Sequence, residues 1–249
     1  MSLVKSIYDL SNSPASFNFM EFLGAAVALG ANHVCFDTRK GVQLKYSEGE
    51  TAERISSILI PCCDIMGVSW SDDHDELNAE DPANLIDPGY HFSAMLYAWR
   101  KMGRMGFVKH WPSLSEPAPQ YTVTLRNYDR FEFRNSDVKA WERFALAIGA
   151  HIIPDYGDEK IPLEKKVALW ANAKMNFFVN NGPANICYLS NFPYLSFFKW
   201  FDKPYHEAMG FSDGSQFPWA TSNQRLLWEM DSYDNLMRAF EAYLKGEFA

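Results

Sequence analysis

Short runs of apolar residues alternate with longer amphipathic segments along the chain. The short runs have the length of a β-strand, whereas the longer segments place apolar side chains three or four positions apart, as an α-helix does. This alternation predicts parallel strands joined by right-handed helical crossovers. The fold class that we predict is therefore α/β, with two small Rossmann-like lobes that each contain a parallel sheet.

The first half of the chain repeats this alternation. We expect strands over Ser6 to Leu10, His33 to Asp37 and Val68 to Trp70, and helices over Phe17 to Leu29, Glu50 to Met66 and Tyr90 to Met105. Ser16 should cap the first helix and Gly30 should end it. Pro61 should kink or end the second helix, because proline has no N–H to donate. The polar stretch from Ser71 to Pro88 is predicted to be a long loop.

The second half shows the alternation more cleanly. We expect strands over Tyr121 to Leu125, His151 to Ile153, Met175 to Val179 and Tyr194 to Phe198. Helices should cover Asp137 to Ile148, a segment that starts at Pro162, Pro183 to Leu189, and Ser232 to Leu244. Gly149 should end the first of these helices.

The segment from Pro112 to Pro119 separates the two halves. Its prolines forbid regular structure, so it is the best candidate for a domain boundary. We therefore predict an N-terminal lobe over 1–115 and a C-terminal lobe over 120–249.

Composition and charge narrow the class of protein. With 249 residues, of which 47% are apolar and 22% charged, the chain can bury a core, and this excludes a disordered or fibrous protein. The 23 basic and 31 acidic side chains give a net charge of −8. A nucleic-acid-binding fold needs a basic footprint, so we expect no nucleic-acid partner.

The chain contains no segment that predicts a membrane span or export. The longest apolar stretch, Phe22 to Ala31, has ten residues, whereas a membrane helix needs roughly 20. The segment from Met1 to Lys5 has no apolar signal core. We interpret the four cysteines as reduced core thiols, since they lack metal-ligand spacing, and expect a cytoplasmic protein; they are Cys35, Cys62, Cys63 and Cys187.

Three arginines follow the strand that ends at Leu125: Arg126, Arg130 and Arg134. Ligands bind beyond the carboxyl ends of parallel strands, so these side chains are placed where a phosphate would arrive. The planar guanidinium group donates two hydrogen bonds to phosphate oxygens. The alternative is that Arg130 and Arg134 are solvated loop charges, paired with neighbouring acids.

A second segment, Asn180-Asn181-Gly182-Pro183-Ala184, follows the strand that ends at Val179. Gly182 allows the backbone to approach a ligand closely, and Pro183 fits a first helical turn. Free N–H groups at such a turn bind anions. The segment is equally typical of a plain tight turn with an Asx cap.

These two segments carry a resemblance to a known family. Val123 to Arg126 and Val179 to Cys187 resemble the nucleotide-binding lobe of GT-B-type glycosyltransferases, especially the heptosyltransferase and fucosyltransferase-like groups. In that family, an arginine at a strand end and a glycine-containing turn hold the donor diphosphate. The segment Phe217 to Gln224 also looks like a loop that shapes the donor pocket, with Trp219 and Gln224 as contact residues. Asn185 lies near the position where heptosyltransferases have a histidine.

The resemblance implies a function and its partners. We expect transfer of a sugar from a nucleotide-diphosphate donor, bound by the C-terminal lobe, to an unknown acceptor on the N-terminal lobe. No separate cofactor is expected, because the nucleotide sugar is itself the substrate. An inverting transfer needs one base near the acceptor hydroxyl, and Asp9 and Asp37 each close a predicted strand of the N-terminal lobe. As the alternative, both aspartates are turn or cap residues.

Two other functions compete with this interpretation. Asp73-His74-Asp75 resembles the Asp-x-Asp element with which GT-A-type glycosyltransferases hold a divalent metal, although acidic loops often contain such a triplet. A chain with the same fold could also bind a nucleotide or sugar without catalysis. The pattern Gly-x-Ser-x-Gly is absent, so the sequence motifs indicate no serine nucleophile.

Overall fold

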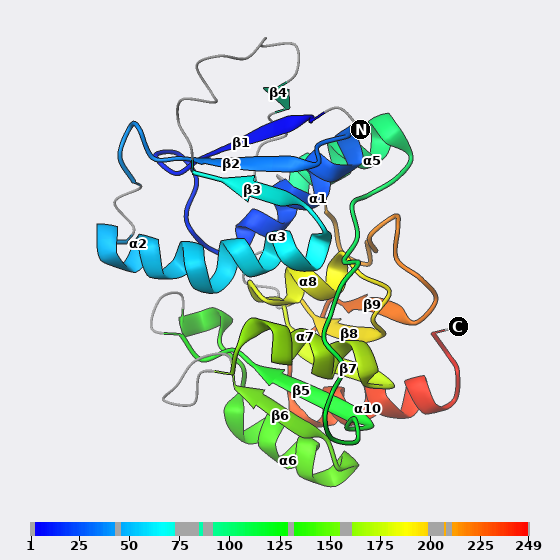
Figure 1. Ribbon diagram of the computed structural model, residues 1–249. Coiled ribbons are helices and arrows are strands. Elements are labelled where there is room, and N and C mark those ends of the chain that lie inside the picture. The colour runs from blue at the N-terminus through cyan, green and yellow to red at the C-terminus, as the bar shows by residue number, and fades with distance from the viewer. Residues whose placement is uncertain are drawn as a thin grey trace. The chain divides into compact units, whose positions relative to one another are not determined.

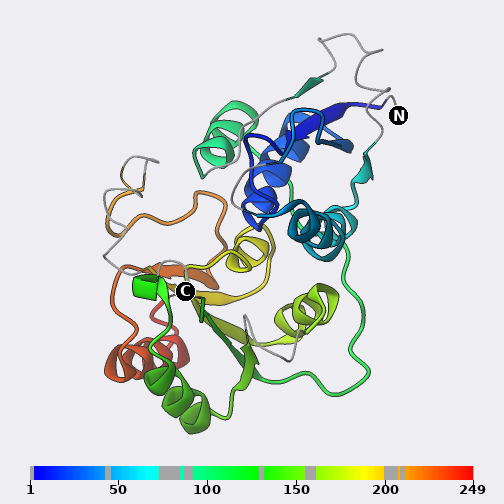
Figure 2. The same ribbon diagram turned by 90° about the vertical axis from the view of Figure 1, so that its left-hand side faces the viewer.

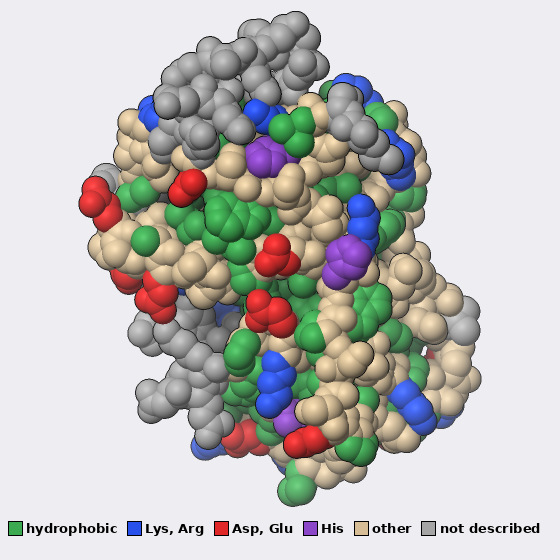
Figure 3. Space-filling model, viewed as in Figure 1, with side chains coloured by type: hydrophobic (Ala, Val, Ile, Leu, Met, Phe, Trp, Pro, Cys, Tyr) green, Lys and Arg blue, Asp and Glu red, His purple; other side chains and the backbone are tan. Residues whose placement is uncertain are grey.

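The computed structural model describes residues 3–42, 46–72, 85–86, 92–128, 132–154, 161–198, 207 and 211–248. Contacts divide the chain into two compact units, Met1–His110 and Trp111–Ala249, which we call the first and second lobe. Figure 3 shows acidic and basic side chains interspersed over the described part of one face. Among the described helices, none combines the length and apolar character needed to cross a membrane.

The first lobe contains a four-stranded parallel sheet in the order β3-β2-β1-β4 (Figure 1). Its strands are β1 (Lys5–Asp9), β2 (His33–Asp37), β3 (Ser69–Ser71) and β4 (Leu85–Ile86). Its described helices are α1 (Asn18–Leu29), α2 (Glu48–Arg54), α3 (Ile60–Met66) and α5 (Phe92–Met102). The strands predicted around β1, β2 and β3 are confirmed, whereas β4 lies inside the segment that was predicted to be a loop.

Aromatic packing fixes α1 against the sheet of the first lobe. Phe19 of α1 meets Tyr8 of β1 and Phe36 of β2 edge-on, with ring centroids 4.8 and 5.6 Å apart. Gly30 ends the helix as predicted, with a left-handed φ of 113°. The helix begins after Phe17, one residue later than predicted, and Ser16 Oγ accepts from the N–H of its first residue, Asn18, at 3.4 Å.

The helix predicted before β3 contains a π-helical turn directly before Pro61. The chain forms α2, then a π-helical turn over Ile55–Leu59, and then α3 with Pro61 in its first turn. Proline cannot donate to the carbonyl four residues earlier, that of Ser57, and its ring crowds that position. The wider turn directly before Pro61 absorbs this conflict, and the helical backbone continues through Pro61 to Met66, so Pro61 does not end the helix.

The second lobe contains a five-stranded parallel sheet in the order β6-β5-β7-β8-β9. Its strands are β5 (Tyr121–Leu125), β6 (His151–Pro154), β7 (Met175–Val179), β8 (Tyr194–Phe197) and β9 (Gln224–Leu227). Its described helices are α6 (Val138–Ile148), α7 (Leu163–Asn172), α8 (Ala184–Tyr188) and α10 (Tyr233–Leu244), with a 3-10 turn over Glu132–Arg134. The predicted fold class, α/β with two Rossmann-like lobes of parallel strands, is confirmed.

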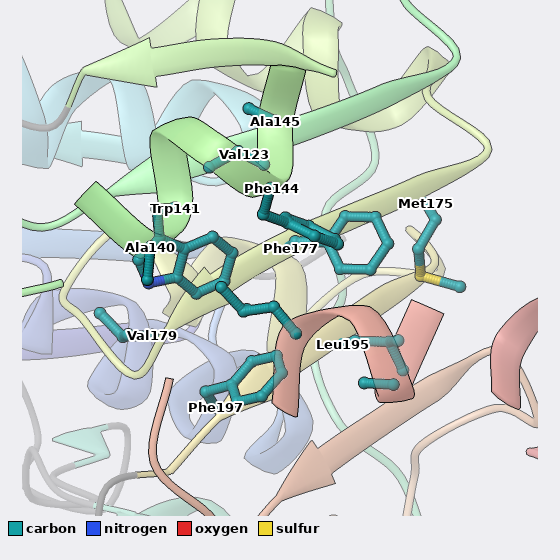
Figure 4. Packing of buried hydrophobic residues seen from close by; sticks show 12 residues of the cluster. Val123, Ala140, Trp141, Phe144, Ala145, Met175, Phe177, Val179, Leu195 and Phe197 are labelled. Carbon is teal, nitrogen blue, oxygen red and sulfur yellow. The ribbon is translucent and has the colours of Figure 1, made fainter. Parts of the chain in front are cut away.

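One face of this sheet carries the apolar core of the second lobe. Figures 1 and 2 show α6 and α10 on this face. Trp141 and Phe144 of α6 pack edge-on against Phe197 of β8 and Phe177 of β7, respectively, with ring centroids 5.6 and 5.1 Å apart (Figure 4). The indole N–H of Trp141 donates to Asp231 Oδ2 at 2.8 Å, so the one polar atom of this ring is satisfied.

The opposite face, covered by α7 and α8, is held by buried polar bonds. Thr122 of β5 donates to Asn176 Oδ1 of β7 at 2.5 Å, and Asn176 Nδ2 donates to the carbonyl of Trp170 in α7 at 2.9 Å. The Trp170 indole donates to Thr124 Oγ1 at 3.0 Å. Because buried polar groups are stable only when bonded, these contacts fix where α7 lies on the sheet.

The strand β9 was not predicted. Its first residue, Gln224, is the last residue of the segment that resembles a donor-pocket loop. Gln224 is 1% exposed; its side chain accepts from the Thr221 N–H and donates to the carbonyls of Ser190 and Phe192. These bonds tie β9 to the segment before β8 and give Gln224 a structural role.

Gly106 offers a test of the packing in the first lobe. Its N–H donates to the Gly24 carbonyl of α1 at 3.0 Å, and an added Cβ would lie 2.6 Å from Val27 Cβ. We expect Gly106→Ala to destabilise the protein by about 1 to 3 kcal/mol, as overpacking does. Gly49→Ala is the matched control, because nothing lies within 4 Å of its Cβ and alanine favours a helix. Urea unfolding measures both; equal effects would contradict this account of the packing.

Candidate functional site

The strand order of the second lobe defines where a ligand would bind. From β5 the chain crosses to β6 on one side, and then to β7 on the other side of β5. In doubly wound sheets, ligands bind outside the carboxyl ends of the two strands at which the order reverses. Those strands are β5 and β7, and the two segments singled out in the sequence, 126–134 and 180–184, follow them.

Arg126 is anchored at the end of β5. It is 6% exposed, and its backbone N–H donates to Ser136 Oγ at 2.9 Å. Its guanidinium donates to Asn135 Oδ1 and lies 5.8 Å from the ring centre of Tyr128. Asn135 also bonds the N–H and the carbonyl of Tyr128, each at 3.0 Å. These bonds join residues 126–128 to Asn135 and Ser136 and hold the arginine at the carboxyl end of β5.

Arg134 joins this loop to the turn after β7. Its Nη2 donates to the Asn180 carbonyl at 3.5 Å, so the structure brings together the two predicted segments. The Tyr188 hydroxyl of α8 lies 3.3 Å from Asn180 Oδ1 and 2.6 Å from Ser196 Oγ. Burial raises the pKa of Tyr188, although the Ser196 bond and the charge of Arg134 oppose it; the phenol stays protonated as a hydrogen-bond donor. Arg130 lies outside the described residues.

The turn after β7 is the Asx-capped alternative. Asn181 Oδ1 accepts from the Ala184 N–H at 2.9 Å, and the Asn185 N–H donates to the Gly182 carbonyl at 3.1 Å. The Ile186 N–H donates to the Pro183 carbonyl at 3.1 Å. These amides are therefore engaged inside the turn. The Asn181 side chain is 4% exposed, and its Nδ2 amide has no hydrogen-bond partner among the described residues.

Trp219 contacts the C-terminal end of α8. Its indole N–H donates to the Tyr188 carbonyl at 2.9 Å, and its ring stacks on Phe217 with centroids 5.0 Å apart. Trp219 is 7% exposed. This packing supports the C-terminal end of α8, while its predicted role in donor binding stays a prediction.

Asp9 and Asp37 are register partners at the carboxyl ends of β1 and β2. Asp37 is 3% exposed and accepts two bonds from the Arg39 guanidinium, at 2.9 and 2.8 Å. Asp9 is more accessible. It accepts from the N–H and hydroxyl of Ser11, and from Lys40 at 3.3 Å. Asp9 accepts from the Ser11 backbone N–H, and Asp37 accepts from the Arg39 backbone N–H. Such bonds to the residue two positions later are typical of turn residues, the alternative role for both aspartates.

The environment of Asp9 favours its charged form. Partial burial opposes ionisation, but the bonds from Ser11 and the nearby Lys40 outweigh it and hold the pKa of Asp9 below its ordinary value of 3.8. Such a carboxylate is ionised at neutral pH, yet it is a weak proton acceptor. Asp73 and Asp75, the competing metal ligands, lie outside the described residues. Among the residues that are described, no group of three His, Cys, Asp or Glu side chains could hold a metal ion.

Three residues that contribute to this site were not predicted from the sequence: Asn135, Ser136 and Tyr188. Asn135 and Ser136 directly follow the arginine segment, and this run of polar residues before an amphipathic helix was the available signal. Tyr188 gave no signal, because it lies in a short helix whose pattern is that of core residues.

The sequence matches no protein-family model and no curated protein. Among solved structures, the chain is similar to the dodecameric iron-containing heptosyltransferase TibC in complex with ADP-D-beta-D-heptose, with 10% identity and a TM-score of 0.47 over 79% of this chain and 59% of that one. A structure of TibC from enterotoxigenic E. coli H10407 gives 12% identity and a TM-score of 0.42 over 78% and 57%.

A universal stress protein from Archaeoglobus fulgidus gives 12% identity and a TM-score of 0.19 over 74% of this chain and 88% of that one. The chain spans less than two thirds of the length of the two TibC chains. At these TM-scores, the likeness assigns no activity to the chain.

Asp9 gives a test of the electrostatics in the first lobe. Its folded-state pKa is lowered, so its contribution to the free energy of unfolding is complete above 3.8 and is lost as pH falls through the folded-state value. We expect the stability difference between the wild type and Asp9→Asn to be constant above a pH of about 5 and to shrink toward pH 3. Urea unfolding at several pH values measures it. A difference that does not change with pH contradicts the assignment.

Proposed function

We propose that the second lobe binds the diphosphate of a nucleotide sugar and that the chain acts as a glycosyltransferase of the GT-B type. The observation that carries this proposal is the bond between Arg134 and the Asn180 carbonyl. It joins the arginine loop to the turn after β7 at the strands where the sheet order reverses.

The donor groups at this edge suit a diphosphate. Arg126 and Arg134 supply guanidinium groups, which match phosphate oxygens in charge and geometry. The buried Asn181 Nδ2 adds a neutral donor. A diphosphate oxygen would satisfy this amide, whose burial without a partner otherwise costs about 1 to 3 kcal/mol.

Two rival functions remain to be separated from this one. A metal-dependent transferase would use Asp73 and Asp75 to hold the donor through Mg or Mn, so a chelator would abolish its turnover. A non-catalytic nucleotide-binding protein would bind the donor but transfer no sugar. The proposed function requires turnover that survives the chelator.

Binding of nucleoside diphosphates tests the donor site. We expect calorimetric titration with ADP, GDP, UDP and CDP to detect binding of at least one of them. Arg134→Ala should weaken that binding by about 1 to 3 kcal/mol, the range for a charged hydrogen bond. Arg126→Lys should weaken it as well, because lysine keeps the charge but loses the planar fork.

Arg238→Ala is the matched control for this experiment. Arg238 is an exposed arginine of the same lobe, in α10, and it pairs with Glu229. Its loss should leave the affinity unchanged. An equal loss in the Arg238 variant, or no binding of any nucleoside diphosphate at millimolar concentration, would contradict the proposal.

The acceptor side of the proposal rests on Asp9 and Asp37. Of the two, Asp9 is the more accessible base, since Asp37 is buried beneath the guanidinium of Arg39. We expect Asp9→Asn to lower turnover strongly while the affinity for the donor stays nearly unchanged, as for a group that acts only in the transition state. Unchanged turnover in both Asp9→Asn and Asp37→Asn would refute this role.

A further inference from the structure

Three polar side chains of the first lobe form a chain of hydrogen bonds that the proposed donor site does not use. His33 lies on β2, and Ser69 and Ser71 lie on the adjacent edge strand β3, where Ser69 is the register partner of His33. His33 Nδ1 is 2.8 Å from Ser69 Oγ, and His33 Nε2 is 2.9 Å from Ser71 Oγ. His33 is 7% exposed, whereas Ser71 is half-buried. The histidine is therefore shielded from solvent, while Ser71 is partly accessible.

The carbonyl of Asn32 decides which way these bonds run. Ser69 Oγ donates to this carbonyl at 3.1 Å, and a carbonyl oxygen can only accept, so the bond uses the one proton of the hydroxyl. Ser69 Oγ must then accept from His33 Nδ1–H. A neutral imidazole with its proton on Nδ1 has a lone pair on Nε2, which accepts the Ser71 proton.

We propose that Ser71 is an activated nucleophile, with His33 as its general base and Ser69 as the residue that positions the imidazole. A hydroxyl within hydrogen-bond reach of a base, which a third group orients in turn, is the arrangement that covalent catalysis requires. Ser71 is the last residue of β3, an edge strand of the sheet, and it is the register partner of Cys35 in the middle of β2. This inference concerns the first lobe and does not depend on the donor site.

The substrate class is an activated carboxylic ester. Ser71 Oγ attacks the carbonyl carbon while its proton passes to His33 Nε2. The bond to the leaving oxygen then breaks, and the imidazolium proton leaves with the alcohol, so the acyl group stays on Ser71. A water molecule, deprotonated by His33, cleaves this ester to release the carboxylic acid and restore the Ser71 hydroxyl.

Labelling with a fluorophosphonate tests the proposal on the full chain. In this reaction the serine oxygen bonds to phosphorus, the P–F bond breaks and fluoride leaves. We expect one adduct, which peptide mapping places on Ser71 and which Ser71→Ala abolishes. Ser56→Ala is the matched control, because the exposed Ser56 hydroxyl donates to the Glu53 carbonyl rather than to a histidine; it should leave the labelling unchanged.

The roles of His33 and Ser69 are tested by the labelling rate. His33→Gln should slow labelling by at least about 100-fold, the lower end for general base catalysis. Ser69→Ala should slow it as well, and Ser69→Thr, which keeps the hydroxyl, should restore it. The wild-type protein alone decides the first point, whatever the stability of the variants: no adduct on Ser71 overturns the proposal. Labelling of Ser71 at an unchanged rate in His33→Gln overturns it equally.

Discussion

The parallel pairing of β5 with β7 is the constraint on which the candidate donor site depends. Thr124 is the register partner of Phe178, so both strands end at the same edge of the sheet. Parallel neighbours cannot be joined by a tight turn, and the chain must travel through α6, β6 and α7 between them. This route brings Arg134 against Asn180, a residue 46 positions later. The sheet topology thus determines where the site lies, and the side chains determine its chemistry.

Buried polar hydrogen bonds between the sheet and the helices on one of its faces hold this edge in place. The face of the sheet under α7 and α8 carries Thr122, Asn176 and Ser196, each of which is 0% exposed. Each needs a partner in the folded state, because a buried polar group without one destabilises it. Their bonds to α7 and to Tyr188 therefore specify one placement of these helices, and with it the position of the turn after β7. The opposite face, which packs on apolar and aromatic side chains, gives stability without comparable directional control.

The sequence predicts this fold well where a periodic pattern coincides with a breaker residue. The strands β5 and β7 and the end of α6 at Gly149 have the bounds that the pattern indicated. The edge strand β9 was not predicted, since Gln224 and Arg225 at its start interrupt the apolar run. At the site, the arginine and asparagine segments follow from their place after strands. The two hydrogen bonds of His33 could not be predicted from the sequence, because contacts with residues 36 and 38 positions away leave no local pattern.

Hydrogen–deuterium exchange with a saturating nucleoside diphosphate shows where the ligand binds, because it reports on both lobes in one experiment. We expect slower exchange at amides of the two segments that follow β5 and β7, residues 126–136 and 180–186. The segment after β1, residues 10–16, should show no change and serves as the internal reference. Protection of residues 10–16 in place of the two segments of the second lobe would contradict the account, and so would the absence of any change.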